Sequence, residues 1–243
     1  RAMAQGSGDY TQPVWSPNGR SIAYVASEGG RNELRVFYLD TQRSATIARL
    51  ASSASNLTWS PDGATLAFQM LAREAPTALP RLPSRPDGAQ WGPTFNVYER
   101  NTYRFNGQGY LPNGSTQIWV VPADGGAPRQ LTFSSADLNG RMSWTPDGRR
   151  LIYSANAEEG FEAQWVESDV YSLNVADGAI RRLTSRDGRE DTPALSPDGR
   201  RLAYVGFDDR VQGYQVTELY VANADGSNPR SLTASFDRDV QAP

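Results

Sequence analysis

Two pairs of adjacent carboxylates are the side chains whose type and spacing best suit chemistry in this chain. Glu158-Glu159 and Asp208-Asp209 each place two acidic groups side by side. Paired carboxylates can act as an acid and a base or can bind calcium. Both pairs are expected in polar loops that follow a strand, where the alternative interpretation is a solvated loop charge.

Histidine and cysteine are both absent from the sequence. A Ser-His-Asp hydrolase needs an imidazole that accepts and returns a proton near neutral pH, so this chain carries no such triad. The same absences remove disulfides and the usual zinc ligands. We predict no catalytic residue, no metal site and no cofactor within these 243 residues.

The segment from Leu71 to Gly114 differs in composition from the rest of the chain. It opens with prolines, which favour extended chain, and then becomes aromatic and basic. The prolines are Pro76, Pro80, Pro83 and Pro86, and the later residues are Trp91, Phe95, Tyr98, Arg100, Tyr103, Arg104, Phe105 and Tyr110. Long excursions from a rigid scaffold often carry function. The candidate contacts for a substrate or partner are Tyr98, Arg100, Tyr103, Arg104 and Tyr110, unless these aromatics only cover an exposed sheet edge.

A hairpin sequence that occurs four times indicates the elements that position these residues. The copies contain Pro17, Pro61, Pro146 and Pro197, each between Trp-Ser, Trp-Thr or Leu-Ser and Asp-Gly or Asn-Gly. Proline presets φ in such a turn, and glycine takes the left-handed position. Each copy therefore reverses one strand into the next, and the Trp before the turn is expected to pack between neighbouring sheets.

Each hairpin lies within a larger unit of four strands. The first strand ends at the Trp or Leu, an apolar second strand follows the turn, and a third and a fourth strand complete the unit. Four-stranded units of about 40 to 50 residues are typical of β-propeller blades. A two-sheet sandwich is the alternative, but it has no reason to repeat one hairpin at equivalent places. We predict an all-β propeller.

The predicted blades span about residues 13–50, 57–133, 142–184 and 193–233, and the second contains the insertion 71–114. Pro243 falls where Pro13 and Pro193 fall, so we expect the chain to stop at the threshold of a fifth inner strand. Propellers of this repeat type usually have roughly six to eight blades, which favours part of a larger propeller. The alternatives are a four-bladed ring, and two arcs that pair their open blade edges as a dimer.

Charge and hydropathy exclude several classes of partner. Lys and Arg number 24 against 27 Asp and Glu, and no basic stripe indicates nucleic acid. No apolar run approaches the length of a membrane span, and the residues after Arg1 lack the apolar core of a signal peptide. We expect a soluble protein with no nucleic-acid and no membrane partner, and the compartment, cytoplasmic or periplasmic, stays open.

The amino-acid sequence of the second predicted blade resembles that of a known family. The run 98–110, the strand and turn 118–126 and the closing Arg129-Gln130-Leu131-Thr132 are similar to the acylaminoacyl-peptidase and dipeptidyl-peptidase-like branch of the prolyl oligopeptidase family. Asn106 stands where that branch is expected to have Asp. The hairpins alone also resemble TolB-type propellers and some polysaccharide lyases. The resemblance covers the whole chain but only the propeller part of such an enzyme.

That resemblance implies a non-catalytic segment of a serine peptidase. The α/β-hydrolase domain of the parent would carry the nucleophile elbow, and no Gly-x-Ser-x-Gly occurs here. This hydrolase domain and short peptides are the implied partners, with the propeller admitting short peptides and excluding folded proteins. In the dipeptidyl-peptidase relatives paired glutamates contact the substrate, which makes Glu158 and Glu159 candidate contacts.

Two other functions are compatible with the same residues. The hairpins support a TolB-like platform for protein interaction, without any catalytic partner domain, equally well. An independent enzyme that acts through carboxylates or calcium, as propeller lyases do, is the third hypothesis.

Overall fold

The computed structural model describes residues 7–75, 86–90 and 97–240 of the protein. Within these ranges the regular structure consists of strands β1 to β18 and one short 3-10 helix, η1 (Phe161–Ala163), which confirms the predicted all-β fold. No helix of the described residues is long and apolar enough to cross a membrane. The predictions for Pro76, Pro80, Pro83, Trp91, Phe95 and Pro243 lie outside the described residues.

Four antiparallel sheets of four strands each make up the body. The first contains β1 (Asp9–Trp15), β2 (Ser21–Glu28), β3 (Arg31–Tyr38) and β4 (Arg43–Leu50). The second contains β5 (Ala54–Trp59), β6 (Thr65–Arg73), β9 (Gly114–Pro122) and β10 (Arg129–Gln130). The third contains β11 (Met142–Trp144), β12 (Arg150–Ala155), β13 (Asp169–Asn174) and β14 (Ile180–Arg182). The fourth contains β15 (Gly188–Leu195), β16 (Arg201–Asp208), β17 (Glu218–Asn223) and β18 (Arg230–Ser231).

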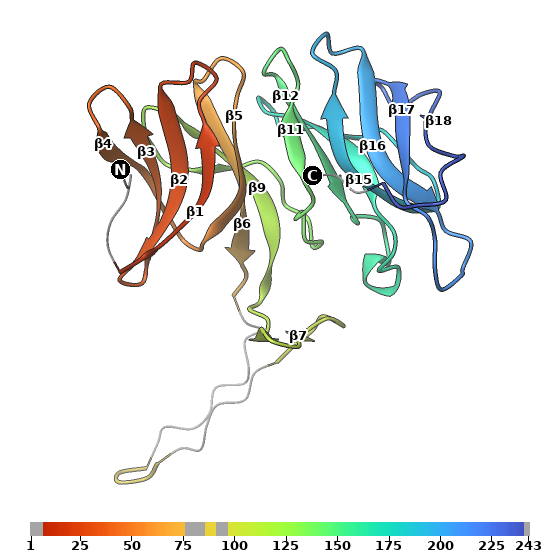
Figure 1. Ribbon diagram of the computed structural model, residues 1–243. Helices are drawn as coiled ribbons and strands as arrows, with labels where there is room; N and C mark the ends of the chain where they lie inside the picture. Colours follow the sequence, from red (N-terminus) through yellow and green to blue (C-terminus); the bar gives the residue numbers. More distant parts are fainter. Residues whose placement is uncertain (1–6, 76–85, 91–96, 241–243) are drawn as a thin grey trace.

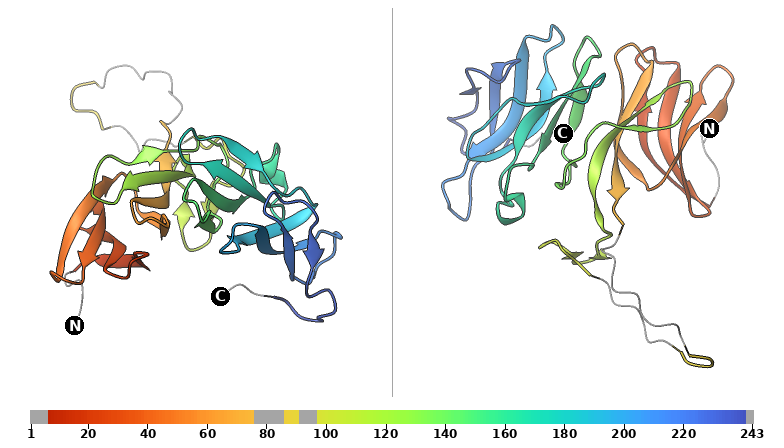
Figure 2. Two further views of the ribbon diagram at one scale, coloured as in Figure 1. Left: turned by 90° about the horizontal axis from the view of Figure 1, so that it is seen from above. Right: turned by 180° about the vertical axis from the view of Figure 1, so that it is seen from behind.

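The four sheets stand side by side along an arc, as the view from above shows (Figure 2). The first and the fourth sheet lie at the two ends of this arc, and the strands of every sheet run roughly along one common direction (Figure 1). This is the radial arrangement of propeller blades, not two facing layers, so the sandwich alternative is wrong. From here on each four-stranded sheet is called a blade.

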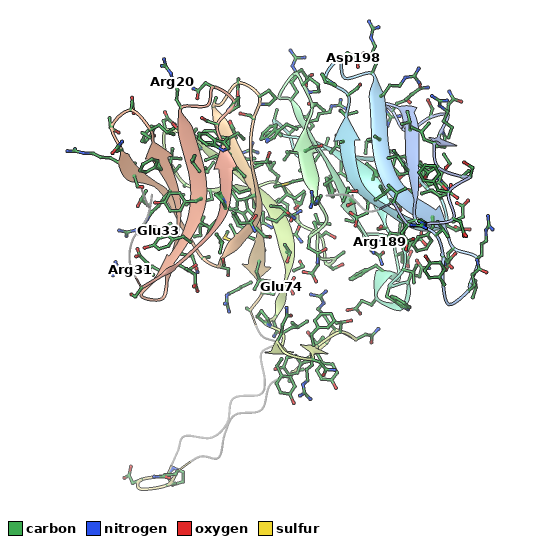
Figure 3. The ribbon with its side chains drawn as sticks, in the orientation of Figure 1. Arg20, Arg31, Glu33, Glu74, Arg189 and Asp198 are labelled. Atoms are coloured by element: carbon green, nitrogen blue, oxygen red, sulfur yellow. The ribbon has the colours of Figure 1, made fainter. Side chains whose placement is uncertain are left out.

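The two ends of the blades differ in what they carry. The repeated hairpins lie together at one end, called the turn end, where Arg20 and Asp198 are labelled in Figure 3. The connections from the second to the third strand, and from one blade to the next, lie at the opposite end, called the loop end (Figure 1). The insertion leaves the second blade at the loop end, between β6 and β9, and contains a two-stranded sheet of β7 (Arg104–Phe105) and β8 (Gly109–Tyr110).

The hairpins have the turn chemistry that the sequence predicts. In the second blade the Ser60 hydroxyl donates to Asp62 Oδ1 at 2.5 Å, and the amide of Gly63 donates to the Ser60 carbonyl at 2.9 Å. The amide of Ala64 donates to the same Asp62 oxygen at 3.0 Å. Gly63 has a φ of 72°, which is the left-handed conformation that glycine adopts without strain. Asp62 is therefore a turn residue.

Apolar side chains fill the spaces between neighbouring blades. Leu34 and Val36 of the first blade pack with Leu66 and Phe68 of the second, and all four are fully buried. Trp59 packs in the same cluster, and its indole Nε1–H donates to the carbonyl of Val14 in the first blade at 3.2 Å. The expectation that the Trp before the turn packs between blades is confirmed for Trp59 and Trp144. It is wrong for Trp15, which is 60% exposed and belongs to none of the clusters between blades among the described residues.

The fourth blade leaves one apolar face without a partner among the described residues. Val205, Leu219 and Val221 of this face are only half-buried. The first blade has Val25 and Leu34 at the equivalent places, and both are fully buried by the second blade. In each of the first three blades, this face is covered by the next blade. A further blade would fit against the fourth in the same way, and the total number of blades stays a prediction.

Several strands extend beyond the limits expected from the sequence. β1 begins at Asp9 and β15 at Gly188, before the prolines that were expected to start these blades. Each strand has an irregular register around its proline, and Gln12 and Thr192 adopt positive φ values of 56° and 49°. This bulge lets the pairing continue past a residue that cannot donate a hydrogen bond.

The insertion is correspondingly shorter than the expected range 71–114. β6 continues to Arg73 and β9 begins at Gly114, and these two residues are paired in the sheet.

Candidate functional site

The structure brings four of the predicted contact residues together in the insertion. The rings of Tyr98 and Tyr110 stack with centroids 5.3 Å apart, and Tyr103 lies 5.7 Å from Tyr98 and 6.3 Å from Tyr110. The guanidinium carbon of Arg104 lies 5.7 Å from the centre of the Tyr110 ring, within the range of a cation–π interaction. Tyr110 is 63% exposed, so this tyrosine cluster presents an aromatic surface at the loop end.

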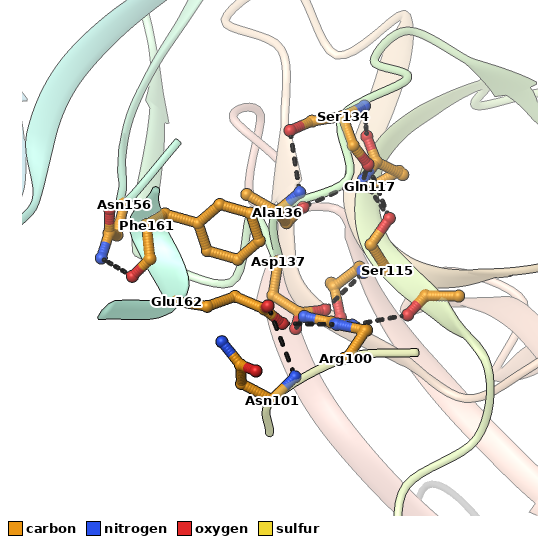
Figure 4. Close-up of polar contacts among 12 residues, drawn as sticks. Arg100, Asn101, Ser115, Gln117, Ser134, Ala136, Asp137, Asn156, Phe161 and Glu162 are labelled. Atoms are coloured by element: carbon orange, nitrogen blue, oxygen red, sulfur yellow. Dashed lines mark hydrogen bonds and ion pairs between the residues drawn. The ribbon is translucent and has the colours of Figure 1, made fainter. Parts of the chain in front are cut away.

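Arg100 joins the insertion to the body of the propeller (Figure 4). Its Nη1–H donates to the carbonyl of Gly114 at 2.8 Å, and its Nη2–H donates to Asp137 Oδ2 at 2.9 Å. Its Nε–H also donates to Glu162 Oε1 at 3.5 Å, and the amide of Asn101 donates to the other oxygen of Glu162. The hydrogen bonds of Arg100 are thus made within the molecule, and they join the insertion to Asp137 and to Glu162 of η1.

The predicted glutamate pair is divided between two roles. Glu158 Oε1 lies 3.0 Å from Arg182 Nη1 and accepts a hydrogen bond from the hydroxyl of Tyr171 at 3.2 Å. Glu159 is exposed and lines an acidic cleft of about 580 Å³ at the outer side of the third and fourth blades. Within the described residues, no three acidic side chains lie close enough together to hold a metal ion.

Two buried carboxyl groups between the third and fourth blades escaped the sequence analysis. Asp169 and Glu190 are each 1% exposed. Asp169 Oδ2 lies 2.7 Å from Arg182 Nη2, whereas the ion-pair contact of Glu190, between its Oε1 and Arg186 Nε, is 4.0 Å long. Burial raises the pKa of Asp169 to about 6 and that of Glu190 to about 7, and the charge of Asp169 adds to the rise at Glu190.

The sequence alone gives no sign of this pair, because a strand pattern does not tell which polar residue faces the next blade.

An open cleft of about 490 Å³ lies between the third and fourth blades at the loop end and is called the inter-blade cleft. Two loops border it, residues 156–168 of the third blade and 209–217 of the fourth. Its lining residues are Asn139, Gly140, Ser154, Ala155, Asn156, Trp165, Val166, Glu167, Ser168, Arg189, Asp191, Phe207, Gln212, Gly213, Tyr214 and Gln215.

Exposed aromatic side chains gather at the loop end. Trp165 and Tyr214, at the rim of the inter-blade cleft, are 86% and 67% exposed, and Phe133, in the connection from the second to the third blade, is 82% exposed. At the turn end Trp15, which is 60% exposed, stands directly before a hairpin, and the hairpins themselves consist of serine, threonine, proline, acidic or amide residues and glycine. Sequence analysis missed Trp165 and Tyr214, although both stand in polar loops after a second strand, which is the signal that could have identified them.

The fold and the loop end define a β-propeller domain built from four-stranded blades. No family model matches the chain. In solved structures it is similar to acylaminoacyl peptidase of Pyrococcus horikoshii, with a TM-score of 0.69 and 16% identity over 96% of this chain and 33% of that one. TolB of Acinetobacter baumannii has a TM-score of 0.60 and 18% identity over 95% of this chain and 45% of that one. The propeller of the Trilobed protease of Pyrococcus furiosus has a TM-score of 0.60 and 17% identity over 96% of this chain and 60% of that one.

Sequence relatives point in the same direction. The uncharacterized protein Atu1656 of Agrobacterium fabrum is 26% identical over 84% of this chain and 67% of that protein. The uncharacterized peptidase YuxL of Bacillus subtilis is 26% identical over 67% of this chain and 24% of its own length. Dipeptidyl-peptidase 5 of Porphyromonas gingivalis is 21% identical over 94% of this chain and 34% of its own length.

The predicted resemblance to the propellers of prolyl oligopeptidase-family peptidases and of TolB is thereby confirmed, and the chain spans about a quarter to a third of the two peptidase relatives.

Proposed function

We propose that this chain is the non-catalytic propeller segment of a serine peptidase and that it controls which peptides reach a hydrolase domain outside these residues. The observation that carries the proposal is the concentration of exposed aromatic side chains at the loop end. Such side chains supply most of the binding energy of protein and peptide interfaces, and their exposure in a free domain favours an interaction surface. The partial coverage of the peptidase relatives supports a longer parent.

In this proposal the chain acts by binding and by exclusion. It contains no histidine, so the proton transfers of a Ser-His-Asp mechanism belong to the hydrolase domain. The tyrosine cluster contacts the peptide or the hydrolase domain, and Arg100 holds the cluster in place. Of the glutamate pair, Glu159 is the contact residue, because Glu158 is already bound to Arg182. Under this proposal the complete propeller of the longer protein excludes folded proteins by their size.

The test compares the cleavage rates of this chain and of the longer natural protein on peptide p-nitroanilides of increasing length and on folded protein substrates. We expect no cleavage by the chain alone, and cleavage of short peptides only by the longer protein. Tyr103→Ala combined with Tyr110→Ala in the longer protein should change the preference for peptide length and leave cleavage of the shortest substrate intact. Peptide cleavage by the pure chain, or a parent gene without a hydrolase domain, would refute the proposal.

A TolB-like interaction platform is the second candidate, favoured by the similarity to TolB over 95% of this chain. It requires the same exposed aromatics at the loop end but no catalytic domain. The parent sequence separates the two candidates, because a platform closes its propeller without a nucleophile elbow or a triad.

A further inference from the structure

We propose that the inter-blade cleft binds an extended peptide by holding one aromatic or large aliphatic side chain between Trp165 and Tyr214. This assignment adds a peptide site within the propeller to the proposed function. It rests on the proposed function only for the class of ligand, a peptide. The cleft has the volume of an ordinary small-ligand site, for which the usual range is about 300 to 1,000 Å³.

The rim of the cleft has the composition of a side-chain binding site. Trp165 comes from the loop of the third blade and Tyr214 from the loop of the fourth, and both rings are mostly exposed to water. The hydroxyl of Tyr214 donates to Asp239 Oδ2 at 3.1 Å, which orients its ring. Phe207, half-buried at the end of β16, adds a third ring to the lining. An apolar side chain that enters would bury these aromatic surfaces and its own.

The floor of the cleft suits a peptide main chain. Ser154, Ala155 and Ser168 are small, so an extended chain can approach closely. Beside them Arg189 Nη2 lies 2.7 Å from Asp191 Oδ2, and the Ser154 hydroxyl donates to the other oxygen of Asp191 at 2.6 Å. A guanidinium carries five N–H donors, and the bond to Asp191 uses one of them. Asp191 Oδ1 also accepts from the amide of Thr192 at 2.7 Å, so the acceptor that remains for a peptide N–H is Asp191 Oδ2, beside the remaining donors of Arg189 for a peptide C=O.

Two of the four amide side chains in the cleft lining, Gln215 and Asn156, are already hydrogen-bonded within the protein, which leaves Asn139 and Gln212 for the hydroxyl groups of a saccharide. Gln215 donates to Asp209 at 2.5 Å and accepts from the amide of Arg210 at 2.7 Å. Asn156 donates to two backbone carbonyls of its own loop, at 3.1 Å and 2.7 Å. The lining also carries Glu167 and Asp191 against Arg189, and this negative balance disfavours anionic ligands.

The test is a titration of the ¹⁵N-labelled chain followed through the indole N–H signal of Trp165, which is assigned by its loss in Trp165→Phe. The probes are N-acetyl-Ala-Phe-Ala-amide, N-acetyl-Ala-Gly-Ala-amide and cellotetraose. We expect the phenylalanine peptide to bind at least about tenfold more tightly than the glycine peptide, since burial of one aromatic side chain is worth that much. Trp165→Ala and Tyr214→Ala should each weaken its binding about tenfold, as measured by calorimetry.

Phe133→Ala is the matched control, because Phe133 is an equally exposed aromatic residue at the loop end outside the cleft lining, and it should bind like the unmodified chain. Equal affinity for both peptides, unchanged affinity of Trp165→Ala, or a response to cellotetraose alone would overturn the proposal. The binding test uses no peptidase activity. A chain that binds the phenylalanine peptide although its parent cleaves nothing would refute the proposed function and keep the cleft assignment.

Discussion

Replacing Glu190 by glutamine should stabilise the protein at neutral and alkaline pH. Glu190 lies on β15 and is 1% exposed, and the hydrogen bond from Thr184 lowers its pKa by less than burial raises it. The nearest cation contact is Arg186 Nε, at 4.0 Å from Oε1. Asp169, a second buried carboxyl, lies in the same space between the blades and disfavours a second negative charge. The neutral amide of glutamine has nearly the same shape and no charge to bury.

The sign and size of the effect follow from the raised pKa. Burial raises the pKa of Glu190 from an ordinary 4.5 to about 7. Between these values the folded state binds more protons than the unfolded state, so the free energy of unfolding falls as pH rises through this window. At roughly 1.4 kcal/mol per pKa unit, the loss from Glu190 is about 3 kcal/mol by pH 8. Glu190→Gln abolishes this loss, so its advantage is close to zero at pH 4 and about 3 kcal/mol at pH 8.

Urea denaturation at pH 4, 6 and 8 measures the effect directly. In thermal denaturation at pH 8, the melting temperature of Glu190→Gln should be higher by roughly 6 to 12 °C, because 1 kcal/mol shifts a domain of this size by about 2 to 4 °C. Glu159→Gln, which neutralises an exposed carboxylate, is the control and should leave the pH profile unchanged. An advantage of Glu190→Gln that is the same at all three pH values, or a destabilisation at pH 8, would refute the reasoning.

Three further substitutions test the packing of the blades and the insertion. Gly226→Ala places a Cβ against a backbone carbonyl of the third blade, at a residue whose φ is 86°. It should lower the free energy of unfolding by more than about 2 kcal/mol in urea denaturation. Gly19→Ala, at a φ of 67° with open space around the added Cβ, should lower it by only about 1 kcal/mol. Trp59→Phe removes the indole hydrogen bond to the first blade and should lower the free energy of unfolding by about 1 kcal/mol; an unchanged value would show that the bond contributes nothing. Arg100→Met should accelerate limited proteolysis in the insertion with little change in the melting temperature, and equal cleavage rates would contradict its positioning role.

The elements that local chemistry specifies could be predicted from the sequence. The hairpin around Pro61 forms from a serine, an aspartate and a glycine that contact one another within five positions, so no distant residue is needed. Four repetitions of that hairpin then identify the blades, because each blade must bury the same face against its neighbour. Trp59 and Trp144 were predicted correctly to pack between blades, but Trp15 has the same place in the repeat and is 60% exposed, so the repeat alone did not determine the burial of this residue.

The candidate site could be predicted only in part. The aromatic composition of the insertion identified the tyrosine cluster, but it could not show that Arg100 donates hydrogen bonds to Asp137 and to the Gly114 carbonyl. Glu158 looked like a contact residue, yet Arg182, 24 positions later in the chain, pairs with it. The inter-blade cleft was not predicted at all, because its walls come from loops of different blades.

The repeat, the all-β architecture and the absence of an imidazole follow from the amino-acid sequence, because each depends on residue types or on contacts between near neighbours in the chain. Which charges are neutralised inside, which carboxyls are buried between blades and which aromatic rings remain in water beside a cleft depend on how the blades pack together. Burial and electrostatic environment depend on what the neighbouring blade presents, and the first strands of successive blades begin at Asp9, Ala54, Met142 and Gly188, far apart in the chain.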